Sequence, residues 1–138
     1  IDLPESWNAI ESSKIKLDAS LGFAERYGFR NSYGLPFRPY NLELKKAYNF
    51  IEVPLNVMDA TLMGYMKVPL DKTSTSIIEF IEKNRTNCVL SILWHNNYFT
   101  KYQYGGYIEE YRKILQYLIE AKLKVITPEE IIKDYYHG

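Results

Sequence analysis

Polar side chains capable of acid–base chemistry stand directly after the apolar segments of this chain. They are Asp18, Asp59, His95 with Asn96, and Thr127. The carboxyl ends of parallel strands meet at one edge of a sheet, so we expect these side chains to share a rim. His95 can give or take a proton near neutral pH, and a carboxylate beside it would fix its tautomer. The predicted chemistry at this rim is proton transfer, with His95 as the strongest candidate.

Each candidate also has a structural interpretation that the sequence leaves open. His95 could serve only to hydrogen-bond a loop, and Asp18 could either orient His95 or stabilise a turn through its own backbone. Asp59 has the same ambiguity, because it is also placed to cap a short helix. Arg30 could bind a carboxylate or phosphate, or stack on the abundant aromatic rings. His137 stands next to the last residue, and we expect it to be solvated.

The elements that must position these residues alternate between strands and helices. We expect helices over 4–12, 59–66 and 105–118, one opening at a Ser76–Glu79 capping box and one following Thr127, with strands over 14–17, 50–57, 88–94 and 123–126. The second half is therefore β-α-β-α, which implies parallel strands and a right-handed crossover. Residues 20–41, rich in Gly, Pro, Arg and aromatics, are predicted to form an ordered loop over the rim. The predicted class is α/β.

Length and composition limit the classes of protein that this chain can represent. The 138 residues suit one domain, and 46% hydrophobic with 25% charged residues is ordinary globular usage. A net charge of +0 and the lack of a basic block argue against a nucleic-acid partner. The longest apolar run in the second half, 89–94, is too short to cross a membrane. Without a signal-peptide pattern, the compartment is undetermined, with the cytoplasm favoured.

Several other chemistries lack the residues that they need. A single cysteine, Cys88, excludes an internal disulfide and a cysteine-based zinc site. The two histidines are far apart and form no H-E-x-x-H, and there is no G-x-S-x-G nucleophile motif. Gly105 and Gly106 open a helix but lack the lysine of a phosphate-binding loop. We therefore expect no metal ligands and no stoichiometric zinc in this chain.

A set of motifs in fixed order resembles the polysaccharide deacetylases, the NodB-homology domain of carbohydrate esterase family four. Residues 89–96, VLSILWHN, resemble the last motif of that family, in which an apolar strand ends in a histidine. Earlier segments are similar to a subgroup of bacterial deacetylase-like proteins: 18–23 DASLGF, 28–30 GFR, 36–37 PF, 52–55 EVPL and 58–62 MDATL. The resemblance covers residues 18 to about 118.

The resemblance implies a distorted (β/α) barrel that removes acyl groups from N-acetylated sugars. In that family a metal ion, usually zinc, activates a water and an aspartate is the general base. His95 would be the general acid, and Asp18 would stand near the motif that orients it. Trp94 would line the acetyl pocket, and the remaining candidates for contact with the carbohydrate are Arg30, Asp59 and Asn96.

The family's first three motifs, which carry the base, the metal ligands and an arginine, have no counterpart here. We therefore expect residues 1–138 to be the C-terminal portion of one deacetylase-like (β/α) barrel, inactive without its N-terminal half and that half's metal site. The incomplete barrel should expose sheet edges, which would favour homo-oligomers. The alternative is a non-catalytic domain that binds carbohydrate through the aromatic loop, or binds a protein partner.

Overall fold

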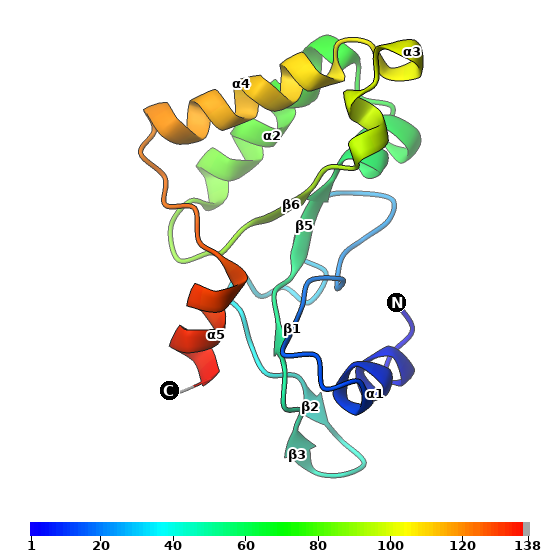
Figure 1. Cartoon of the computed structure of the whole chain (residues 1–138), viewed down its shortest axis with the longest axis vertical. Helices are drawn as coiled ribbons and strands as arrows, with labels where there is room; N and C mark the ends of the chain where they lie inside the picture. The colour runs from blue at the N-terminus through cyan, green and yellow to red at the C-terminus, as the bar shows by residue number, and fades with distance from the viewer. Residues whose placement is uncertain (137–138) are drawn as a thin grey trace.

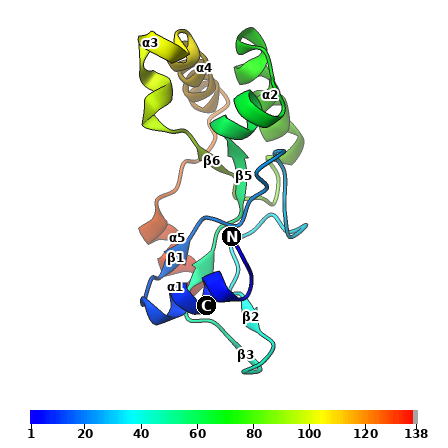
Figure 2. The ribbon, with the colours of Figure 1, turned by 90° about the vertical axis from the view of Figure 1, so that its right-hand side faces the viewer.

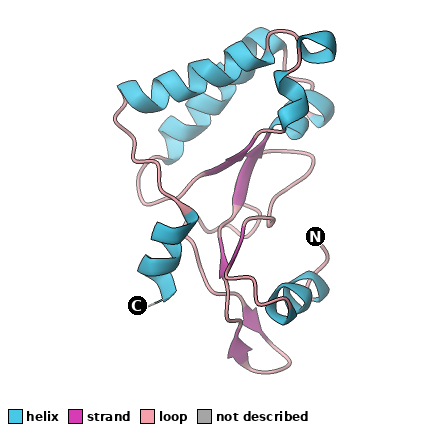
Figure 3. Cartoon of the chain, viewed as in Figure 1, coloured by secondary structure: helices cyan, strands magenta, loops and turns pink. Residues whose placement is uncertain are grey.

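Short strands and helices make up the fold of residues 1–136, the part of the chain that the computed structural model describes (Figures 1 and 3). The elements in chain order are α1 (Glu5–Ser12), β1 (Leu17–Asp18), β2 (Tyr40–Asn41), β3 (Lys46–Ala47), β4 (Ile51–Glu52), β5 (Leu55–Met58), the π-helix η1 (Thr61–Tyr65), α2 (Leu70–Asn84), β6 (Ser91–Leu93), the 3-10 helix η2 (Asn96–Phe99), α3 (Lys101–Tyr104), α4 (Tyr107–Glu120) and α5 (Pro128–Tyr136). In this part of the chain, no helix has both the length and the apolar character for a membrane span.

The strands form three separate pairs. β1 and β4 are parallel, β5 and β6 are parallel, and β2 and β3 form an antiparallel hairpin. The α/β class predicted from the sequence is confirmed, together with parallel strands. Among residues 1–136 these pairs do not close into a barrel, so the predicted barrel is not observed.

Pro54 divides one extended segment between two of these pairs. Proline has no backbone N–H to donate, so strand pairing is interrupted there. β4 pairs with β1 before the proline, and β5 pairs with β6 after it, with an irregularity in the register between Leu55 and Val57. As a result, Glu52 ends one parallel strand, and Asp59 follows the other.

Two long helices cover the β5–β6 pair. Figure 2 shows α2 and α4 side by side above these strands. Their shared core consists of Val57, Leu62, Ile77, Phe80, Ile81 and Ile114. Burial of this apolar surface is the main stabilising contribution in this half of the molecule. A polar contact joins the helices as well, because the buried Glu110 carboxylate accepts hydrogen bonds from the backbone N–H and hydroxyl of Ser74 at 3.0 and 2.6 Å.

Several predicted boundaries are wrong. α2 begins at Leu70, after the extended Pro69, so Ser76 lies inside the helix and caps nothing. β6 is shorter than the predicted strand over 88–94, and residues 123–126 form no strand. The capping box before α5 is confirmed, since the Thr127 N–H donates to Glu130 at 2.8 Å and the Glu130 N–H donates to the Thr127 hydroxyl at 3.3 Å.

Gly106 opens α4 in a conformation that disfavours other residues. Its φ is +97°, and an added Cβ would lie 2.6 Å from Cδ2 of Leu70. Gly106→Ala is therefore expected to lower the free energy of unfolding by about 1–3 kcal/mol, measured by urea denaturation. Gly64→Ala is the control, because it adds a Cβ in η1 with nothing within 4 Å. Equal stability of the two variants would contradict this account.

Candidate functional site

The parallel β5 and β6 deliver Asp59 and His95 to the same edge of the molecule. Met58 and Leu93 are register partners at the carboxyl ends of these strands. Asp59 directly follows Met58, and His95 stands two residues beyond Leu93. Strand pairing therefore brings together two side chains that lie 36 residues apart in the sequence.

The Asp59 carboxylate is completely buried and binds His95 through both oxygens. Its Oδ1 lies 2.6 Å from the Nδ1 of His95 and accepts the backbone N–H of Ala60, also at 2.6 Å. Its Oδ2 accepts the backbone N–H of His95. Asp59 thus fixes the imidazole, the backbone behind it and the start of the helical turn. Of its two sequence interpretations, the contact with His95 is observed, whereas η1 has Ala60 at its N-cap position and no side-chain cap hydrogen bond.

This arrangement determines which nitrogen of His95 is available for chemistry. An ionised carboxylate only accepts hydrogen bonds, so Nδ1 carries a hydrogen toward Asp59 and Nε2 is left as the reactive nitrogen. The His95 side chain is 45% exposed, and no group within residues 1–136 hydrogen-bonds Nε2. Neutral His95 can accept a proton at Nε2, and charged His95 can donate one.

Tyrosine rings surround one side of the Asp59–His95 pair. The Tyr98 ring meets the imidazole edge-on, with centroids 6.4 Å apart, and packs on the Tyr104 ring at 4.4 Å. Tyr107 completes the group at 5.7 Å from Tyr98. Burial raises the pKa of the Tyr98 phenol, and the nearby negative charge of Asp59 raises it further. Tyr98 was not identified from the sequence, although its spacing of three residues from His95 is a signal for one turn.

The structure does not bring Asp18 to His95, which corrects its predicted role as the orienting residue. Asp18 ends β1, which pairs with β4 rather than with the strands that carry Asp59 and His95. Its register partner is Glu52, and its Oδ2 accepts the hydroxyl of Ser20 at 2.6 Å. The local contact with Ser20 agrees with the alternative interpretation of Asp18 as a loop-stabilising residue.

Glu52 forms a second buried acidic group that sequence reasoning missed. Its side chain is inaccessible to solvent, accepting the Leu21 N–H at 3.1 Å and the Trp7 indole N–H at 3.3 Å. Burial raises the pKa of Glu52 to about 8, assisted by the charge of Asp18 and a hydrogen bond with it. Near neutral pH Glu52 is therefore mostly protonated, and its carboxyl group donates a hydrogen bond to Asp18.

The other predicted site residues are dispersed. Trp94 packs against the helix–strand core, with its ring 5.2 Å from that of Tyr111. It points away from His95 because neighbouring side chains of an extended segment point to opposite sides.

Arg30 donates to the Gly22 carbonyl at 3.2 Å, near the amino end of β5. Asn96 begins η2 with its side chain exposed, and Thr127 caps α5. Only Asn96 remains next to the pair, and His137 lies outside the described residues.

The described residues do not fit the zinc ion that the resemblance implies. Residues 1–136 contain no group of three or more His, Cys, Asp or Glu side chains placed to hold a metal. His95 has its Nδ1 committed to Asp59, and the Glu52–Asp18 pair brings only two carboxyl groups. The chemistry that Asp59 and His95 themselves support is proton transfer.

Comparisons of the chain with protein-family models, with curated proteins and with solved structures found no match. The evidence for function is therefore the geometry of the Asp59–His95 pair and the residues that carry the family resemblance.

Proposed function

We propose that this chain contributes the general acid to a metal-dependent hydrolase that removes acyl groups from N-acetylated sugars. In this proposal the chain is the C-terminal portion of a deacetylase-like (β/α) barrel domain. The observation that carries it is the 2.6 Å contact between Asp59 and the Nδ1 of a half-exposed His95, at the carboxyl end of parallel strands. This arrangement suits the strand-terminal histidine of the last deacetylase motif.

His95 would act on the bond between the acyl carbon and the sugar nitrogen. When that bond breaks, the nitrogen leaves as an amine and needs a proton, which Nε2 of charged His95 can supply. Asp59 keeps the other nitrogen protonated and stabilises the charged ring before the transfer. The exposed side of the imidazole gives the leaving group access without moving Asp59.

The proposal places the metal and its ligands in polypeptide other than residues 1–136. Zinc or another divalent ion would bind there, because the described residues offer no ligand set. On this view, the chain alone binds no stoichiometric zinc and releases no acetate. Its partners are the carbohydrate substrate and the N-terminal half of the domain.

A second candidate is carbohydrate binding without catalysis. The tyrosines beside His95 favour it, because aromatic faces with hydroxyl groups suit sugar rings. The loop over 20–41 favours it less, since Tyr27 and Phe29 pack on Phe80 in the core. Such a module would bind an oligosaccharide and leave its acetyl groups in place.

The test measures acetate released from N-acetylated chitooligosaccharides by two proteins. One is the product of the complete reading frame that encodes this chain, and the other is residues 1–138 alone. We expect release by the first that is lost on metal chelation, and none by the second. Oligosaccharide binding without acetate release by either protein would favour the binding module. Release by residues 1–138 that survives chelation would contradict the proposed division of the site.

A further inference from the structure

Tyr98 is placed against the Asp59–His95 pair by the turn that follows β6. Its backbone N–H donates to the carbonyl of His95 at 3.1 Å, which closes the 3-10 turn and returns the ring to the imidazole. The rings then meet at an interplanar angle of 62° with centroids 6.4 Å apart. The phenol is also close enough to Asp59 for the carboxylate charge to affect its ionisation.

Rings from two helices hold Tyr98 from the other side. Tyr104 of α3 and Tyr107 in the first turn of α4 both contact its ring. α4 is itself fixed to α2 through the buried Glu110 and the shared core. The Tyr98 ring is therefore packed between the imidazole on one side and the rings of Tyr104 and Tyr107 on the other.

We propose that Tyr98 is a positioning residue for His95. Its ring closes one side of the pair, keeps water from the Nδ1–H···Oδ1 hydrogen bond, and limits rotation of the imidazole so that Nε2 faces outward. The effect requires the ring and not the hydroxyl, because the contact with His95 is between ring edges and faces. Its consequence for catalysis rests on the proposed function, but the contact itself can be tested without any activity.

The experiment uses residues 1–138 labelled with ¹⁵N-histidine. The chain has two histidines, so the signals of His95 are those lost in His95→Ala. In the natural chain we expect the Nδ1–H tautomer and a ring proton that exchanges slowly with water. Tyr98→Ala is expected to speed this exchange at least tenfold and to mix the two tautomers, whereas Tyr98→Phe should preserve the natural pattern.

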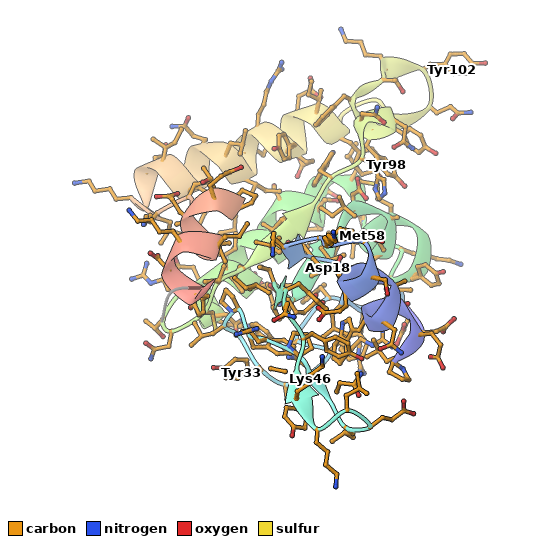
Figure 4. The ribbon with its side chains drawn as sticks, turned by 60° about the horizontal axis from the view of Figure 1, so that its bottom comes forward. Asp18, Tyr33, Lys46, Met58, Tyr98 and Tyr102 are labelled. Atoms are coloured by element: carbon orange, nitrogen blue, oxygen red, sulfur yellow. The ribbon has the colours of Figure 1, made fainter. Side chains whose placement is uncertain are left out.

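Tyr102→Ala is the matched control. Tyr102 lies only four residues away, but this residue of α3 is 94% exposed (Figure 4). We expect this variant to leave the His95 signals unchanged. If Tyr98→Ala does not fold, Tyr98→Leu takes its place, because leucine fills part of the volume without supplying a ring. The inference is overturned if exchange in the folded Ala or Leu variant stays within twofold of the natural rate, or if Phe is as disruptive as Ala.

A separate measurement distinguishes this inference from the proposed function. In the product of the complete reading frame, Tyr98→Ala should lower kcat for acetate release at least fivefold and leave KM within twofold. Tyr98→Phe should restore the natural kcat. If no acetate is released by any form, the hydrolase proposal fails, and the NMR result alone decides whether Tyr98 positions His95.

Discussion

Glu52→Gln is expected to remove most of the loss of stability that the chain suffers between mildly acidic and alkaline pH. At pH 9 the variant should exceed the natural chain in free energy of unfolding by roughly 3 kcal/mol. At pH 5 the two should be similar, with the variant lower by about 1 kcal/mol if the Trp7 hydrogen bond is lost. The measurement is urea unfolding at several pH values, with the slope in urea checked for constancy.

The sign of this pH dependence follows from whether the folded or the unfolded chain holds the proton of Glu52. Glu52 has a pKa of about 8 in the folded chain against 4.5 for a free side chain, so between these values the folded form holds a proton that the unfolded form has released. The contribution of this group is complete below pH 4.5 and declines as the pH rises to 8, by about 1.4 kcal/mol per unit at most. Glutamine is neutral throughout, so it removes this slope.

Two further variants test whether the raised pKa of Glu52 causes this pH dependence. Asp18→Asn should lower the pKa of Glu52 by removing its charged neighbour, and should make the pH dependence shallower without abolishing it. Glu25→Gln changes an exposed carboxylate in the loop and should leave the slope as it is. A Glu52→Gln profile parallel to that of the natural chain would show that Glu52 is ionised in the folded protein.

The fold could be predicted where a segment carries its own boundary signals. The Gly105–Gly106 opening of α4 and the capping box of α5 are local chemistry, and the structure has both. The start of α2 was missed because Ser76 and Glu79 form a capping pattern inside a helix that the preceding proline already starts. Residues 123–126 have strand-like composition, but strands require a partner edge, and they pair with none in the described chain.

The site could be predicted as far as strand ends determine it. Placing Asp59 and His95 at the carboxyl ends of strands was sufficient to bring them to one edge. Choosing between Asp18 and Asp59 was not possible, because that choice depends on which strands pair across the interruption at Pro54. Glu52 was missed because strand alternation predicts an exposed side chain there, whereas Ile51, Glu52 and Val53 are all buried.

The most direct consequence of the Asp59–His95 geometry is that the two side chains should act as one unit. In the product of the complete reading frame, His95→Ala is expected to lower kcat for acetate release by about 100- to 10,000-fold, because the leaving amine loses its proton donor. Asp59→Asn should also lower kcat, by roughly tenfold or more, because an amide cannot stabilise the charged ring or enforce its tautomer. KM should change little in either variant.

The double variant, with both Asp59→Asn and His95→Ala, tests whether the two side chains act as one unit. If Asp59 acts only through His95, then Asp59→Asn adds almost nothing once His95 is alanine, and the effects are far from additive. Asp71→Asn, at the exposed start of α2, is the matched control and should leave kcat unchanged. An unchanged kcat in His95→Ala removes His95 from the mechanism. Both oxygens of the Asp59 carboxylate are occupied by His95 and Ala60, so we expect no contribution of Asp59 that bypasses His95. Additive losses would contradict this expectation and show that Asp59 has a role of its own.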